Sequence, residues 1–299
     1  MSRNPDQGLV PGMALAVTGA IAFSGKAIIV KLAYRYGVDA VTLIMLRMLF
    51  ALPIFAAMAW WAGRGKAALS PGDWMGVAGL GVIGYYLSSF LDFAGLQYIT
   101  ASLERLILYL NPTLVLLLGW LLYRKNFHRI QLVGMAISYC GVILVFGHEA
   151  RLEGGQAALG ALLVFASAFT YAVYLVYSGH LVHRLGALRL VGLATTIACL
   201  CCLLQFAALR PLASALEVAP QVVWLSVLNA TFCTAAPVLM VMMAVERIGP
   251  ALAAQAGMVG PMSTILMGVL ILGEPFTAWI AAGTVLVIAG IFVFSRGAR

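Results

Sequence analysis

The chain has 299 residues, of which 63% are hydrophobic and 9% charged, and its mean hydropathy is +1.03. Soluble domains carry about 25% charged residues, so a soluble fold is excluded because too few polar side chains remain to cover its surface. The net charge of +8 does not indicate nucleic-acid binding, since the basic residues lie in short loops between apolar stretches and form no stripe with aromatics. An all-α membrane protein is therefore expected.

Ten apolar segments follow one another along the chain, each close to the 20 residues that a helix needs to cross a bilayer core. The first segment is long and interrupted by Lys26, which favours a retained helix over a cleaved signal peptide. Short connections make consecutive helices antiparallel. The predicted spans are 11–34, 39–63, 72–97, 101–122, 128–147, 156–181, 186–209, 219–245, 250–272 and 276–295.

The two halves of the chain match each other. Ile99–Phe146 aligns with Ile248–Ser295 without a gap after a shift of 149 residues. A shared proline and three shared glycines mark common backbone requirements, and they indicate two five-helix repeats, 11–147 and 156–295. Five is an odd number, so the second repeat is inverted, and inverted repeats around a central cavity give two conformations open to opposite faces. The shared pairs are Pro112/Pro261, Gly119/Gly268, Gly134/Gly283 and Gly141/Gly290.

Loop charges predict the orientation of the bundle in the membrane. Eleven lysines and arginines lie on the side of the N-terminus and four on the other side. Basic loops stay in the cytoplasm, so both termini are expected there.

Five charged residues lie in or at the edge of the first four spans, all in repeat one and all at depths in the outer half of the membrane. Such charges are costly unless they are paired or hydrated. They form either an outer gate of ion pairs, whose surplus positive charge meets a substrate carboxylate, or a structural salt-bridge cluster. Lys26 is nearest the midplane and is singled out for the substrate. The five residues are Lys26, Arg47, Asp92, Glu104 and Arg105.

Polar and aromatic residues share faces of spans three, six, eight and nine, because their spacing follows the helical period. Tyrosines offer both a ring and a hydroxyl, and a lining of this kind suits amphipathic solutes. Hydrogen bonds between helices are the alternative role, worth about 0.6 kcal/mol each. The cavity candidates are Lys26, Tyr85, Ser88, Tyr109, Tyr171, Tyr174, Asn229, Cys233, Gln255 and Met262.

Pro112 and Pro261 remove a helical hydrogen bond at matched depth, so they are either hinges or simple structural kinks. Asn111 is placed to bond a carbonyl that Pro112 frees.

Glycines within the spans are read as packing positions. The run Gly79–Gly84 fits the GxGxxG dinucleotide motif but lies within a span rather than between a strand and a helix, so helix packing is expected. The pairs Gly134/Gly141 and Gly283/Gly290 allow spans five and ten to pack closely against each other, the bundle or another protomer.

The five-plus-five arrangement, with a proline in spans four and nine, resembles the drug/metabolite transporter superfamily and, more closely, its EamA-type exporters. Pro261–Phe276 is similar to the ninth-span signature of that family, and Gly273-Glu274 matches its Gly-Glu, whereas repeat one has Arg124-Lys125 there. The length and overall pattern are also similar to bacterial aromatic amino acid exporters of the YddG kind. The resemblance implies that the inner helices line a cavity while spans five and ten lie peripherally.

We therefore expect a carrier in the bacterial inner membrane that exports small metabolites by alternating access, uncoupled or by exchange. The expected substrates are amino acids that are aromatic or large and apolar. The alternatives are efflux of lipophilic cations or drugs, and proton-coupled antiport. An enzyme is not expected, because the sequence has no HExxH motif and its histidines cluster at loops. We expect no cofactor, no metal and no nucleic-acid partner, and a monomer or homodimer in the lipid bilayer.

Overall fold

The computed structural model describes residues 6–123, 129–153, 155–241, 243–244, 247–248 and 259–296. In these ranges all regular elements are helices. Eight helical stretches are long and apolar enough to cross a membrane, and Met262–Leu272 and Ala278–Val293 form two shorter apolar helices. The protein is thus an all-helical membrane protein of about ten spans, as predicted.

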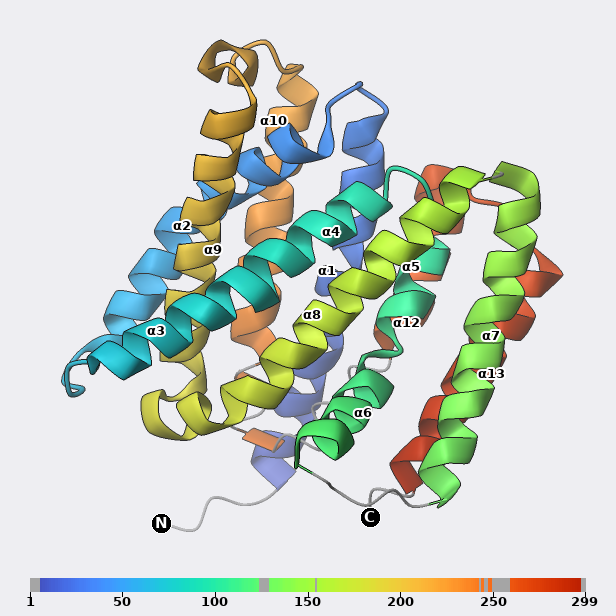
Figure 1. Cartoon of the computed structure of the whole chain (residues 1–299), viewed down its shortest axis with the longest axis horizontal. Coiled ribbons are helices and arrows are strands. Elements are labelled where there is room, and N and C mark those ends of the chain that lie inside the picture. Colours follow the sequence, from blue (N-terminus) through green and yellow to red (C-terminus); the bar gives the residue numbers. More distant parts are fainter. Residues whose placement is uncertain are drawn as a thin grey trace.

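The elements divide between the two halves of the chain (Figure 1). The first half contains α1 (Asp6–Tyr34), α2 (Ala40–Gly63), α3 (Pro71–Leu80), η1 (Gly81–Leu87), α4 (Ser88–Gly95), α5 (Ala101–Leu108), α6 (Asn111–Tyr123) and α7 (Arg129–Glu153). The second half contains α8 (Gly155–Leu185), α9 (Ala187–Leu209), η2 (Leu212–Ala215), α10 (Pro220–Ala230), η3 (Thr231–Ala235), α12 (Val259–Met267), η4 (Gly268–Leu272) and α13 (Ala278–Arg296).

Short polar side chains fix where the early spans begin. Asp39 caps α2 by accepting hydrogen bonds from the next turn. Ser70 and Asp73 form a capping box at the start of α3, with Pro71 in the first turn. Thr100 caps α5 by accepting from the backbone N–H of Leu103 at 3.1 Å. These caps hold the turns between spans one to four at defined residues.

Spans three and eight each contain a π-helical turn at the same depth. Shifting η1 by 149 residues gives 230–236, which encloses η3. A π turn adds a residue to the helix and changes the direction of the side chains beyond it, and it is frequent at functional sites. The repeats therefore share a backbone irregularity in the middle of equivalent spans.

Span four is broken between α5 and α6 rather than kinked at the proline itself. Pro112 has no N–H to donate to Leu108 O, the carbonyl four residues earlier. The Asn111 side-chain amide donates to that oxygen instead, at 3.1 Å, as predicted. Pro261 is the third residue of α12, and residues 249–258 before this helix lie outside the described ranges. The hinge role of both prolines therefore stays a prediction.

Helices α7 and α13 lie side by side at one edge of the bundle (Figure 1). A Cβ atom on Gly141 would lie 2.7 Å from the carbonyl oxygen of Gly283, and one on Gly290 would lie 2.6 Å from that of Gly134. Spans five and ten thus pack directly against each other through these glycines, one of the arrangements that their spacing predicted.

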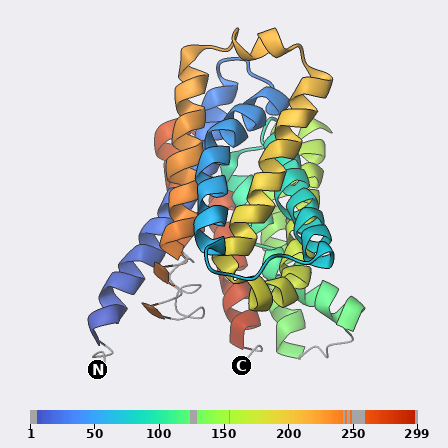
Figure 2. The same cartoon turned by 90° about the vertical axis from the view of Figure 1, so that its left-hand side faces the viewer.

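The glycine run in span three also serves packing. A Cβ atom on Gly81 would lie 2.6 Å from the carbonyl oxygen of Ala194 in α9, and one on Gly84 would overlap the Tyr174 side chain in α8. The interpretation of this GxGxxG match as a helix contact is confirmed. Figures 1 and 2 both show the start of α1 and the end of α13 at the same end of the bundle, as an even number of spans requires. We call the opposite end, where α1 meets α2, the Tyr34 end, and it is the end predicted to face outward.

Candidate functional site

A cavity of about 310 Å³ lies between the two repeats. The first repeat contributes side chains from α1, α2, η1 and α4 to α6, and the second from α8, α9 and η3. Helices α7 and α13 contribute none of the lining residues, which agrees with the peripheral position expected for spans five and ten. A space of this size accommodates a small organic molecule.

Half of the ten predicted cavity residues line this space. They are Lys26, Tyr85, Ser88, Tyr109 and Tyr171. Tyr174 is buried behind Tyr85, and Asn229 and Cys233 are buried within span eight without being part of the lining. Met262 is 50% exposed and lies outside the lining. Gln255 falls outside the described residues.

The sequence interpretation missed several lining residues. Two of them could have been predicted from the internal repeat. Thr234 and Val238 stand 149 residues after Tyr85 and Ser89, and all four side chains line the cavity. Equivalent positions of spans three and eight therefore face the same space. The further apolar lining residues Phe23, Met48 and Phe55 have no distinguishing sequence pattern.

Four of the five predicted charged residues form one buried cluster at the Tyr34 side of the cavity. Lys26 Nζ lies 2.5 Å from Asp92 Oδ2 and 3.5 Å from Glu104 Oε1. Arg105 Nε lies 3.8 Å from Glu104 Oε2, and Glu104 is fully buried. The Phe23 ring lies under both cations, 5.7 Å from Lys26 Nζ and 5.7 Å from Arg105 Cζ. Pairing of this kind lowers the cost of charges within a membrane.

The fifth charge, Arg47, lines the same cavity from α2. Its guanidinium lies over the Phe93 ring, with 5.0 Å between Cζ and the ring centroid. The residue is 6% exposed, and its Nε and Nη1 atoms have no hydrogen-bond partner. Three buried cations thus face two carboxylates, which leaves the site with one surplus positive charge.

An aromatic and hydroxyl wall lines the same cavity as the charged cluster, and its residues Tyr85 and Ser88 lie on the same span as Asp92. Tyr85 Oη donates to Tyr174 Oη at 3.2 Å, and the two rings meet edge to face with centroids 4.9 Å apart. Tyr171 stacks on Tyr174 at 5.5 Å. Ser88 and Ser167 join α4 to α8 through their hydroxyls, 3.1 Å apart. The wall therefore combines apolar faces with polar atoms held in fixed positions.

The Gly-Glu sequence at the end of span nine ties the second repeat to the first. Gly273 adopts a left-handed conformation with φ of 74°, so the chain turns back and Glu274 is buried at the start of α5. The Glu274 carboxylate accepts hydrogen bonds from the backbone N–H of Ala101 at 2.7 Å and from Ser102 Oγ at 2.7 Å. A carboxylate at a helix N-terminus is stabilised by the helix dipole.

The last turn of α1 makes further bonds at this end. Lys31 Nζ donates to the carbonyl oxygens of Leu96 and Ile99 at 3.2 and 3.0 Å. Arg35 Nη2 donates to Leu272 O, across the repeats, at 2.6 Å. Leu96 and Ile99 are themselves fully buried. The Tyr34 end is therefore closed by packing and by bonds between the repeats.

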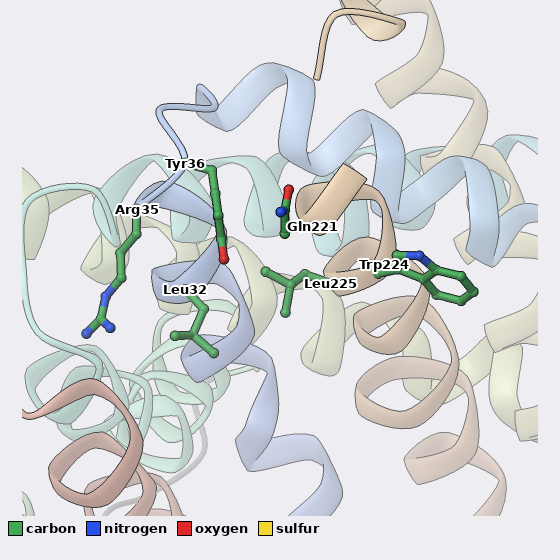
Figure 3. A pocket seen from close by; sticks show the side chains of 6 residues that line it. All are labelled: Leu32, Arg35, Tyr36, Gln221, Trp224 and Leu225. Atoms are coloured by element: carbon green, nitrogen blue, oxygen red, sulfur yellow. The ribbon is translucent and has the colours of Figure 1, made fainter. Parts of the chain in front are cut away.

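A second hollow, of about 390 Å³, lies at the Tyr34 end between α1 and α10 (Figure 3). Trp224 in its wall is 70% exposed, and the hollow shares no lining residue with the central cavity. The buried ion pairs and the tyrosine wall make the central cavity the candidate site. The hollow is lined by Leu32, Arg35, Tyr36, Gln221, Trp224 and Leu225.

The EamA-like transporter family matches residues 10–147 and 158–296 of the chain. The chain is 30% identical to the uncharacterized transporter YcbK of Bacillus subtilis, over 88% of this chain and 86% of that protein. It is 24% identical to an uncharacterized transporter of Archaeoglobus fulgidus, over 93% of this chain and 95% of that protein.

A solved crystal structure, 20% identical in sequence, covers 96% of this chain and 98% of its own with a TM-score of 0.65. That likeness shows the fold alone. The two segments of the family match also span almost the whole chain, and each contains one set of the shared proline and glycines. The protein belongs to the EamA-like transporter family, and is thus a membrane transporter rather than an enzyme.

Proposed function

We propose that this transporter exports an amino acid with an aromatic or large apolar side chain from the bacterial cytoplasm, with both termini on the cytoplasmic side. One observation carries the proposal: the cavity between the repeats is lined both by a surplus of positive charge and by tyrosine rings and hydroxyls. The positive charge suits a carboxylate, and the rings suit an apolar side chain. The similarity to YddG-like aromatic amino acid exporters supports the same substrate class.

Alternating access follows from the repeats and from the closed Tyr34 end. In the proposed cycle the bonds of Lys31, Arg35 and Glu274 between helices at this end break as the cavity opens outward, and equivalent contacts form at the other end. Transport is proposed to be uncoupled or to proceed by exchange, with the substrate gradient as the driving force.

Proton-coupled antiport is a second candidate function, and one observation favours it. The Asp92 carboxyl group, which lines the cavity, and the fully buried Glu104 carboxyl group both contact Lys26 Nζ. Ionisable groups on a transport pathway mark proton relays. Efflux of lipophilic cations, by contrast, is disfavoured by a cavity lined by three cationic side chains and one carboxylate, with Glu104 fully buried beside Lys26.

Reconstituted liposomes test the proposal. The uptake of labelled L-tryptophan by counterflow is measured in the presence of competing unlabelled amino acids or cationic dyes. Protein-free liposomes serve as the control. We expect phenylalanine, tryptophan and leucine to compete and the dyes to have no effect. Transport of dyes that amino acids do not inhibit would contradict the proposal. Accumulation of tryptophan driven by a pH gradient alone would establish the second candidate.

A further inference from the structure

The cations of the central cavity differ in whether a carboxylate already lies beside them. Unpartnered nitrogens do not distinguish the two arginines, because Arg105 Nε and Nη2, like Arg47 Nε and Nη1, have no hydrogen-bond partner within the described part of the chain. Lys26 Nζ contacts Asp92 Oδ2 at 2.5 Å and Glu104 Oε1 at 3.5 Å. Arg105 lies against Glu104 and the Phe23 ring. Both residues therefore already have a carboxylate neighbour before a substrate arrives, and a substrate carboxylate that binds either one must compete with it.

Arg47 is placed differently. Among the residues that the structure describes, its guanidinium makes no ion pair, and its Nε and Nη1 atoms have no hydrogen-bond partner. The residue is 6% exposed and lines the central cavity. A buried cation without a counter-charge is strongly unfavourable, so a vacant guanidinium facing a cavity points to an anion that completes it.

The surroundings of Arg47 hold its guanidinium in a fixed position. Its plane lies over Phe93, which is fully buried, and Cys199 and Cys202 on α9 are fully buried beside α2. A guanidinium fixed by an aromatic ring in apolar surroundings binds a carboxylate bidentately and with little loss of side-chain entropy.

We propose that Arg47 is the residue that binds the substrate's carboxylate, while Lys26 holds the ion-pair cluster together. The inference rests on the proposed function and narrows its substrate class to molecules with one carboxylate and an apolar body.

Binding of three probes to the purified full-length protein tests this inference. The probes are L-phenylalanine, L-phenylalaninamide, which lacks the carboxylate, and 3-phenylpropionate, which lacks the ammonium group. The variants are R47Q and R47K. R64Q is the matched control, because Arg64 lies just after the same helix and also stacks on an aromatic ring, Trp60, at 4.2 Å, but is outside the cavity.

We expect R47Q to weaken phenylalanine binding roughly 10- to 100-fold, as the loss of a charged hydrogen-bond pair does, and R47K to weaken it less. Binding of the amide should be weak in the wild type and no weaker in R47Q, and R64Q should match the wild type throughout. The melting temperature of R47Q should not fall, because Arg47 has no partner to leave unpaired, whereas that of K26Q should fall.

The outcomes separate this inference from the proposed function. If R47Q binds phenylalanine as the wild type does, or loses affinity for the acid and the amide equally, Arg47 does not bind the carboxylate although the amino-acid function stands. If the wild type binds phenylpropionate in an Arg47-dependent manner but not phenylalanine, the carboxylate site stands and the amino-acid function is wrong. A wild type that binds neither carboxylate contradicts both.

Discussion

The two repeats share several backbone features but not their charges. Each has a π turn in its third span, a proline in its fourth and a glycine face on its fifth, all related by the same shift of 149 residues. Four of the five charges of repeat one, Lys26, Asp92, Glu104 and Arg105, correspond under this shift to the apolar residues Leu175, Val241, Ala253 and Ala254 of repeat two. The proposed alternation between two conformations would rest on the backbone symmetry, whereas the charge asymmetry places the buried ion pairs in one repeat only.

In the proposed function, this division separates the shared parts of the two repeats, which would change conformation, from the part that would recognise the substrate. A shared hydrogen bond illustrates the symmetric part: Ser138 Oγ approaches Val287 O at 3.5 Å, and these two residues are themselves related by the 149-residue shift. Contacts of this kind join equivalent positions of the two repeats. The ion pairs of repeat one have no such counterpart. Substitutions of these charges should therefore have different effects from substitutions in the shared frame, by which we mean the prolines, the glycines and the third-span π turns common to both repeats.

The largest effect is expected from replacing Glu104 by alanine, the residue at the equivalent position of repeat two. Glu104→Ala leaves three buried cations facing one carboxylate, and the loss of one partner from a buried ion pair destabilises a protein by about 3–5 kcal/mol. The melting temperature of the purified protein should fall strongly. Arg210→Gln is the control, because Arg210 pairs with Asp39 at 3.4 Å with both side chains at least one third exposed, and exposed pairs contribute about 0–1 kcal/mol.

A double variant sharpens this test. Replacing Arg105 by alanine as well copies repeat two at both positions and restores the surplus of one positive charge. We expect the double variant to melt well above the single one. A single variant that melts like the wild type, or a double variant that melts lower still, would show that charge balance does not govern this cluster.

The sequence predicted the symmetric part of the molecule better than the site. Spans, repeats and the glycine contact follow from hydropathy and spacing, and the Asn111 bond follows from the local geometry of proline. On span eight, candidates were chosen by a 3.6-residue period, but the π turn η3 changes the helix phase, so Thr234 rather than Cys233 lines the cavity. The partners of Lys26 were also unpredictable, because long side chains select among several carboxylates only in three dimensions.

Substitutions in the glycine face between spans five and ten test whether the two repeats are equivalent there. A Cβ atom on Gly141 meets the Gly283 carbonyl, and the symmetry-related Gly290 meets the Gly134 carbonyl. We expect Gly141→Leu and Gly290→Leu to lower the stability by similar amounts, about 1–3 kcal/mol, as overpacked contacts do. Gly147→Leu is the control on α7, because a Cβ there has nothing within 4 Å. A large difference between Gly141→Leu and Gly290→Leu would contradict the equivalence of the halves.

The smallest effect is expected at span four, where the repeats share the proline but not its neighbour: repeat one has Asn111 and repeat two has Gly260. Asn111→Ala removes the bond to Leu108 O and should cost about 0.5–1.5 kcal/mol. Adding Pro112→Ala supplies a backbone N–H for the same oxygen, so the double variant should regain the lost melting temperature. If the break in span four is a hinge, the double variant should nevertheless transport more slowly than the wild type in liposomes. Stability regained together with unchanged transport would instead show that Pro112 is only a structural kink, and that the conformational change relies on other parts of the shared frame.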